Sequence, residues 1–204
     1  MMKNLPFDTV NLSADDVQVM DDAYKALKTK FNIGLPDAGF INRFELFNNE
    51  QEASVSGTFL LNYPSVACYL NFVKIHYNYT AGRSRVNNYK CQAWVFVNLK
   101  SDFGRVLIRK ETLTDKLLEM VHHTELKFSD DKVFSDNFYA AANDIGKALT
   151  GMTQAFRNVI KENMYLNFVI EINGIALVIR NSQPIDAEQT IHLAELASKI
   201  AALK

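Results

Sequence analysis

Asp102-Phe103-Gly104 is the first group of residues whose types and spacing could do chemistry. The same three residues form the magnesium-binding motif of protein kinases. A kinase also needs a glycine-rich loop, a strand lysine paired with a helix glutamate, and a His-Arg-Asp catalytic loop. None of these motifs is present, and 204 residues are too few for a kinase fold. We therefore interpret Asp102–Gly104 as a tight turn in which Gly104 supplies backbone freedom.

The histidines and cysteines lack the spacing of a metal or catalytic site. His122 and His123 are adjacent near an expected helix end, so their rings would point in different directions, and there is no Cys-x-x-Cys or His-x-x-x-His pair. Cys68 and Cys91 lie in strand-like apolar segments, which favours buried free thiols over a disulfide. No Gly-x-Ser-x-Gly elbow marks a serine nucleophile. We predict no catalytic residue, no metal site and no cofactor, and we expect a protein that is not an enzyme.

Arg83 and Arg85 are the most suggestive polar residues, because Ala81-Gly82-Arg83-Ser84-Arg85 would lie at the tip of a hairpin. Forked guanidinium donors bind phosphate or carboxylate, and nearby tyrosines stack on bases or lie at lipid headgroups. The flanking tyrosines are Tyr77, Tyr79 and Tyr89. The segment from Thr80 to Asn88 is predicted to form a long hairpin loop. The alternative to a binding role is a solvated loop whose charges discourage edge-to-edge aggregation. Arg105, Arg109 and Lys110 would extend the basic surface if their strand were adjacent.

Composition excludes several classes of protein. The net charge of −1 and a pI near 6.4 provide no global attraction to nucleic acid or anionic lipid. The longest apolar runs have the length of strands, and the N-terminus has no apolar signal region. We therefore expect a cytoplasmic protein without a transmembrane segment, for which peripheral contact with a membrane stays open.

The segment 13–31 predicts an N-terminal helix that begins at Ser13 and ends before Gly34-Leu35-Pro36. Its apolar residues recur at spacings of three and four and form one narrow stripe. The stripe consists of Val17, Met20, Tyr24, Leu27 and Phe31. Two interpretations are open: the helix lies on the body of the domain, or the stripe binds a partner or a second copy, as a coiled-coil seam does.

The segment 40–109 predicts a meander of antiparallel strands, because apolar residues alternate between turn signals. The run from Val66 to Tyr79 changes phase, which predicts a bulge or bend between Asn71 and Lys74. A turn at 100–104 then leads into a strand at 106–109.

The segment 166–180 predicts a β-hairpin around Asn173-Gly174, a pair that suits a type I′ turn. A two-residue loop there would pair Ile172 with Ile175, Ile170 with Leu177, and Phe168 with Ile179, all on one face. Helices are predicted at 112–121, 145–160 and 184–203. We therefore expect an α+β fold with an antiparallel meander, packed helices, and a helix at each end. It would form one domain over residues 1–204, in which the helix at 13–31 could be an appendage to a core at 40–204.

The segment 134–160 resembles a bacterial family known as a domain of unknown function, number thirty-one thirty-seven. The family pattern has Phe-x-x-x-Phe, then aspartate, then alanine, then Leu-Thr-Pro at a helix start. The matching positions are Phe134, Phe138, Asp144, Ala148, Met152-Thr153-Gln154 and the following Phe156. Met152 and Gln154 depart from that pattern, and the membrane-spanning segments of many relatives are not seen. The resemblance covers roughly residues 45–204 and implies a shared fold, a bacterial source and a location near the cytoplasmic face of a membrane. It also implies two helices, with a break near Gly151, in place of one at 145–160.

These patterns favour a non-enzymatic binding or protein-interaction module, acting through the stripe on the helix at 13–31 or through the Arg83/Arg85 loop. The alternative is a domain that binds a small ligand or an anionic lipid headgroup in a cavity between sheet and helices. An enzyme of unknown type is a distant third hypothesis.

Overall fold

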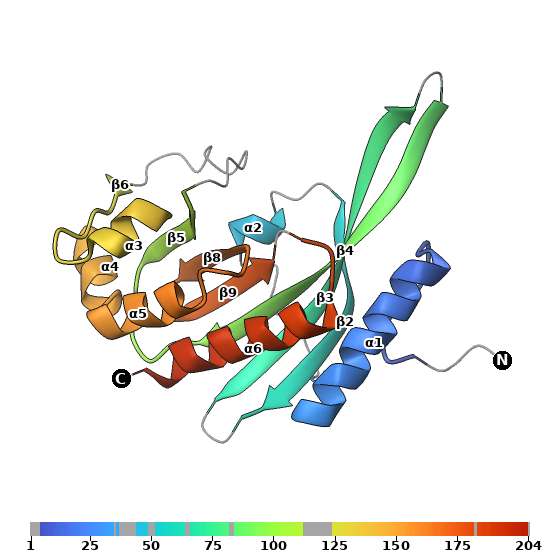
Figure 1. Cartoon of the computed structure of the whole chain (residues 1–204), viewed down its shortest axis with the longest axis horizontal. Helices are drawn as coiled ribbons and strands as arrows, with labels where there is room; N and C mark the ends of the chain where they lie inside the picture. The colour runs from blue at the N-terminus through green and yellow to red at the C-terminus, as the bar shows by residue number, and fades with distance from the viewer. Residues whose placement is uncertain are drawn as a thin grey trace.

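The computed structural model describes residues 5–34, 36, 44–48, 52–63, 66–81, 84–111, 124–181 and 183–203. Its strands form one nine-stranded antiparallel sheet in the order β1-β2-β3-β4-β9-β8-β5-β7-β6 (Figure 1). The strands are β1 (Asn32–Gly34), β2 (Ala53–Asn62), β3 (Ala67–Ala81), β4 (Ser84–Asn98), β5 (Arg105–Lys110), β6 (Thr124–Glu125), β7 (Phe138–Ala142), β8 (Phe168–Asn173) and β9 (Ala176–Asn181). The helices are α1 (Ala14–Lys30), α2 (Glu45–Asn48), α3 (Lys132–Asn137), α4 (Ile145–Gly151), α5 (Gln154–Glu162) and α6 (Ala187–Ala202). The α+β class, the antiparallel sheet and the helix near each end are confirmed.

The sheet is not a simple meander, because the hairpin β8–β9 is inserted between β4 and β5. β4 pairs with β9, and β8 pairs with β5. The connection from β4 to β5 passes around the turn of that hairpin: Leu99 N–H donates to Ile175 O at 2.6 Å, and Phe103 N–H donates to Gly174 O at 3.0 Å. The chain therefore places its last hairpin in the middle of the sheet.

The register of this hairpin corrects our prediction. Ile170 pairs with Ile179 and Ile172 with Leu177, so the loop is Gly174-Ile175 and not Asn173-Gly174. Gly174 has a φ of +65° whereas Ile175 has no positive φ, which fits a turn with glycine at the first central position. Because the pairing shifts by two residues, the isoleucines and leucine still share one face, but Ile175 leaves the sheet and is half-exposed.

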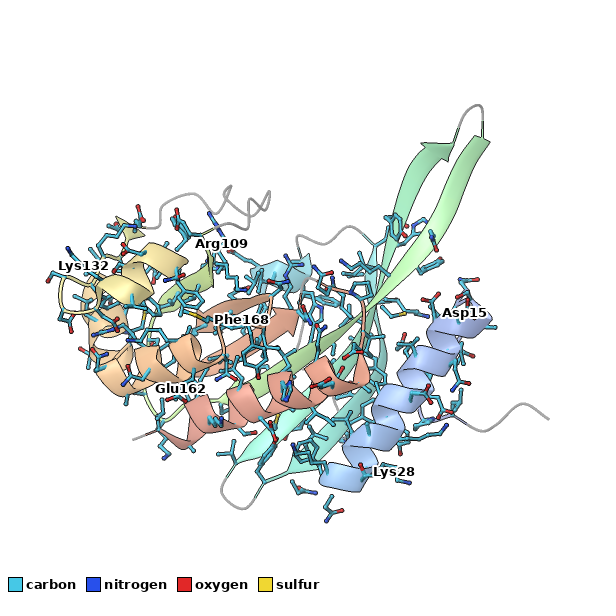
Figure 2. The ribbon with its side chains drawn as sticks, viewed as in Figure 1. Asp15, Lys28, Arg109, Lys132, Glu162 and Phe168 are labelled. Carbon is cyan, nitrogen blue, oxygen red and sulfur yellow. The ribbon has the colours of Figure 1, made fainter. Side chains whose placement is uncertain are left out.

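The two faces of the sheet carry separate hydrophobic clusters. The larger cluster lies between the sheet and α1, α3, α4, α5 and α6, and Phe168, labelled in Figure 2, belongs to it. The smaller cluster lies on the other face, around Trp94 and the short helix α2.

Burial on both faces explains the pattern in β3 that we read as a change of phase. Leu70 and Phe72 belong to the larger cluster, and Val73 and Ile75 to the smaller one. The bulge lies in the neighbouring strand: β2 pairs Val55 with Val73 and Gly57 with Phe72, which leaves Ser56 as the extra residue. The predicted bulge was therefore placed on the wrong strand.

The single helix predicted at 145–160 is two helices, as the resemblance implied. Asp144 caps α4 and Thr153 caps α5, because each side chain accepts the backbone N–H three residues later. Asn143, the residue before the cap Asp144, accepts the Arg105 N–H at 2.7 Å. The predicted helix at 112–121 lies wholly outside the described residues. Helix α3 and strand β7 were not predicted.

Candidate functional site

Strands β3 and β4 extend beyond their neighbours and form a two-stranded projection (Figure 1). The pairing of β2 with β3 ends at Ala53 and Ile75, and the pairing of β9 with β4 ends at Trp94 and Arg180. From His76–Tyr89 to Ala81–Ser84, the strands pair only with each other among the described residues. We call residues 76–89 the arm. The predicted loop from Thr80 to Asn88 is therefore wrong, because β3 continues to Ala81 and β4 begins at Ser84.

The arm is basic and contains no acidic residue. Arg85 lies in β4 opposite Thr80, whereas Arg83 lies outside the described residues. Lys90 follows the arm directly, and the sequence has no aspartate or glutamate between residues 53 and 101. The acid-free stretch covers β2, β3 and β4 entirely, so it includes the arm without marking where the arm begins and ends. Tyr77 is 42% exposed, so the arm also presents an aromatic side chain to solvent.

Ion pairs hold the base of the arm on the body. His76 Nδ1 contacts Glu52 Oε2, and the His76 ring lies 4.9 Å from the Tyr89 ring between centroids. On the same face of β3, Lys74 Nζ contacts Asp8 Oδ2 at 2.5 Å, and the bond from Lys74 lowers the pKa of Asp8. Sequence reasoning missed Glu52 and Asp8, because they are distant from the arm along the chain.

The basic residues of β5 do not extend the arm, because β9 and β8 separate β5 from β4. Arg105 pairs with Glu45. Arg109 is buried, donates to Lys110 O at 2.9 Å, and lies over the Tyr139 ring at 4.5 Å. These arginines therefore stabilise the fold locally.

The apolar stripe of α1 packs on the sheet of the same chain. Met20 and Leu27 are fully buried in the larger cluster. Tyr24 contacts Phe59 at 5.1 Å between ring centroids, and the Phe31 ring contacts Tyr63. Val17 is half-buried. This placement corresponds to the first interpretation of the stripe, a helix laid on the body of the domain.

A buried ionic network joins α3 to α5. Asp131 Oδ2 accepts from Arg157 Nε at 3.1 Å and from Lys161 Nζ at 2.8 Å, and Asp131 Oδ1 accepts the Phe134 N–H. Burial opposes ionisation of Asp131, but bonds from Lys161, Phe134, Arg157 and Gln154 outweigh it and lower the pKa to about 2. Because both Asp131 oxygens are bonded within the protein, we assign this network to stability.

Glu171 is a second buried carboxylate, on the face of the sheet that α2 covers. Its oxygens accept the Glu45 N–H at 3.0 Å and the Leu46 N–H at 2.8 Å, so it caps the start of α2. Burial raises the pKa of Glu171, and the two backbone bonds only partly offset that effect. Because both oxygens of Glu171 accept backbone N–H groups at the start of α2, we assign this carboxylate to the stability of the fold.

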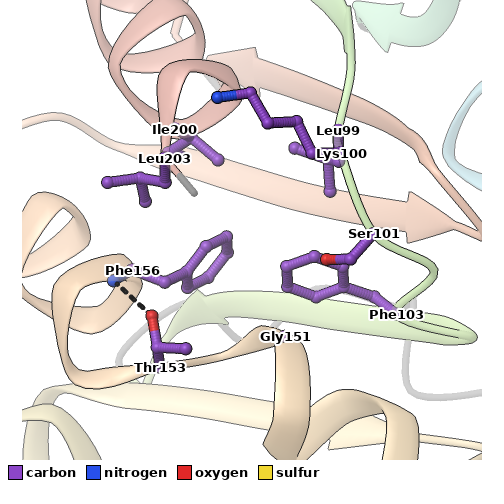
Figure 3. Close-up of a pocket in the computed structure, with 9 residues that line it drawn as sticks. All are labelled: Leu99, Lys100, Ser101, Phe103, Gly151, Thr153, Phe156, Ile200 and Leu203. Carbon is purple, nitrogen blue, oxygen red and sulfur yellow. Dashed lines mark hydrogen bonds between the residues drawn. The ribbon is translucent and has the colours of Figure 1, made fainter.

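A small open recess lies between the β4–β5 connection, the α4–α5 junction and the end of α6 (Figure 3). Phe103 and Phe156 form its floor, and their ring centroids are 5.3 Å apart. Its volume of about 20 Å³ holds one or two water molecules and is too small for a lipid or metabolite.

The described residues contain no group of three or more His, Cys, Asp and Glu side chains that could hold a metal ion. Cys68 and Cys91 are free and buried, and burial raises the pKa of each thiol to about 12, which disfavours the reactive thiolate. Within the part of the chain that the structure describes, no helix is both long and apolar enough to cross a bilayer.

Comparison with known proteins provides one structural likeness. No protein-family model and no curated protein sequence matches the chain. The fold is similar to that of the mycobacterial trehalose monomycolate transport factor A, TtfA, with a TM-score of 0.59 and 7% sequence identity. The match covers 90% of this chain and 92% of that one. At this identity, the likeness shows a shared fold.

Proposed function

We propose that this protein is a non-enzymatic binding module whose arm binds anionic lipid headgroups at a membrane surface. The observation that carries the proposal is the projection of β3 and β4 beyond the sheet with basic residues and no acidic residue. The arm reaches about 20 Å from the sheet, because His76–Ala81 contributes six residues at about 3.3 Å each. It could therefore contact a surface while the body stays clear of it.

The chemistry of the arm suits the interface between water and lipid. Each Lys or Arg near an anionic leaflet contributes about 1 kcal/mol, and tyrosine is enriched at the level of the headgroups. Because the whole chain has a net charge of −1, attraction must come from the arm, and it orients the molecule.

Two likenesses support a role connected with lipid. The structural neighbour is described as a mycobacterial trehalose monomycolate transport factor, and trehalose monomycolate is a lipid. The resemblance to the bacterial family of unknown function implies a position near the cytoplasmic face of a membrane, and we keep that membership as a hypothesis. Binding of a lipid inside a cavity receives no support from the recess of Figure 3, given its small volume.

The test is co-sedimentation with vesicles of phosphatidylcholine alone and vesicles that also contain phosphatidylserine. We compare the wild type with the variant Arg83→Ala/Arg85→Ala/Lys90→Ala, which removes the two arginines of the arm and the lysine that directly follows it. Loss of three charges at about 1 kcal/mol each weakens binding to the anionic vesicles by about 100-fold.

The matched control removes three exposed lysines outside the arm, Lys28→Ala/Lys127→Ala/Lys132→Ala. Figure 2 labels Lys28 and Lys132. This control changes the net charge equally and should leave binding within a few-fold of the wild type, because these lysines are not in the arm. Equal weakening in both variants, or equal binding to neutral and anionic vesicles, contradicts the proposal. An acidic protein captured through the arm without vesicle binding would assign the arm to a protein partner.

A further inference from the structure

The arm leaves the sheet at an ion pair that contains a titratable group. Pairing of β2 with β3 stops at Ala53 and Ile75. Glu52 directly precedes Ala53, and His76 directly follows Ile75 in β3. Glu52 has a φ of +57°, an uncommon value for a residue other than glycine, and its carboxylate contacts His76 Nδ1. The side chain of His76 is only 15% exposed, so this contact lies at the junction of arm and body.

The His76 ring also takes part in the first pairing of the arm. His76 pairs with Tyr89, and the planes of the two rings are inclined by 35°. An ion pair that holds His76 against Glu52 therefore holds both strands of the arm at their base. Two-stranded ribbons are only marginally stable in water, so the arm depends on such anchoring at its base.

We propose that protonation of His76 locks the arm onto the body, and that the locked arm binds its anionic surface more tightly. The proposal rests on the function proposed above and adds its regulation. An ion pair with imidazolium is stronger than a hydrogen bond with neutral imidazole, and histidine is the side chain that changes charge between pH 5 and 8.

Other charged groups lie around the junction. Lys74 on the same strand is paired with Asp8 from the N-terminal segment. The charge of Asp16, at the start of α1, contributes to the raised pKa of Cys91, which lies two residues after Tyr89 in β4. Across the junction, β4 contributes Tyr89. The other charged and titratable groups around the junction are therefore Glu52, Lys74, Asp8, Asp16 and Tyr89, and none of these is a histidine.

The membrane itself would favour the locked state. A surface potential of about −30 mV concentrates protons about threefold at the leaflet. Binding and protonation are reciprocal, so approach to an anionic surface promotes protonation of His76, and protonation promotes binding.

The first experiment measures the lock without lipid. Hydrogen–deuterium exchange of the arm is compared at about pH 5 and about pH 8, after normalisation for intrinsic exchange. In the wild type, we expect about fivefold greater protection at the lower pH. His76→Gln and Glu52→Gln should each abolish that dependence, whereas His192→Gln, a histidine on α6, should retain it. Retention of the dependence in either of the first two variants overturns the proposal.

The second experiment repeats the vesicle assay at both pH values. We expect about fivefold tighter binding at the lower pH in the wild type and in His192→Gln, but equal binding at both values in His76→Gln. A pH-dependent lock without vesicle binding at either pH overturns the proposed function and leaves the lock intact. Vesicle binding that strengthens equally in wild type and His76→Gln overturns the lock.

Discussion

Asp131 and Arg157 show how one buried pair organises its surroundings. Both side chains are about 95% buried, and Arg157 also donates to Met152 O and lies over the Phe128 ring. Removal of one partner from a buried pair leaves the other charge uncompensated, which costs more than the pair contributes. Loss of a single carboxylate from this network should therefore lower the stability of the fold strongly.

Asp131→Asn should lower the free energy of unfolding by about 3 kcal/mol near neutral pH, because Arg157 loses its buried counter-ion. Since its pKa is depressed to about 2, the contribution of Asp131 is present above its ordinary value of 3.8 and is lost as the pH falls through about 2. Urea denaturation at several pH values measures both effects. Asp130→Asn, at a side chain that is 67% exposed, should cost less than about 1 kcal/mol.

Glu171 should show the opposite pH dependence. Its pKa is raised in the folded protein, so the stability that its protonation contributes is present below the ordinary value of 4.5 and is lost as the pH rises through the folded pKa. Relative to Glu171→Gln, the wild type should therefore gain stability as the pH falls from neutral toward 4.5. Fluorescence of Trp94, the single tryptophan, follows unfolding. The exposed Glu162→Gln variant should show no such trend, and a flat difference for Glu171→Gln would disprove the prediction.

At the scale of elements, two glycines of α4 have different surroundings. A Cβ on Gly151 would lie 2.6 Å from the Phe103 ring, whereas a Cβ on Gly146 would lie 3.5 Å from Asp144 Oδ1. Gly151→Ala should therefore cost about 1–3 kcal/mol through overpacking. Gly146→Ala should be neutral or stabilise by about 0.5 kcal/mol, because alanine favours the helix. Equal effects in thermal unfolding would contradict this difference.

The stripe of α1 should behave as part of the core. Leu27→Ala should destabilise the protein by about 3 kcal/mol, since Leu27 is fully buried. Val19→Ala, on the outer side of the same helix and at a residue 40% exposed, should change stability by less than about 0.5 kcal/mol. If Leu27→Ala left stability unchanged but abolished self-association, the stripe would be an interface and not core.

At the scale of the whole molecule, the arm and the body are separable. A variant in which Tyr77 and Asn88 are joined by Asn-Gly, replacing residues 78–87, should unfold within about 2 °C of the wild type, because the described strand residues among those removed pair only with each other. The same variant should lose binding to anionic vesicles. A large decrease in the melting temperature would show that the arm supports the fold.

Local interactions made much of the fold predictable. Ser13 and Thr153 cap helices, and alternation in β4 places Cys91, Ala93, Val95 and Val97 in the larger cluster. Capping and strand alternation depend on residues a few positions apart, so both can be recognised in the local sequence. Gly174 was rightly seen as a turn residue, but the turn begins one residue later, and its backbone bonds to the β4–β5 connection, which is distant along the chain.

The sequence by itself determined the α+β class, the helices near both ends, the buried thiols and the apolar face of the last hairpin, because side-chain period and burial decide these features locally. Only the tertiary structure decided that β8–β9 lies between β4 and β5, that β3 and β4 continue as an arm, and that Glu52 meets His76. These features depend on which segments distant along the chain become neighbours, and no pattern within a single segment records that choice.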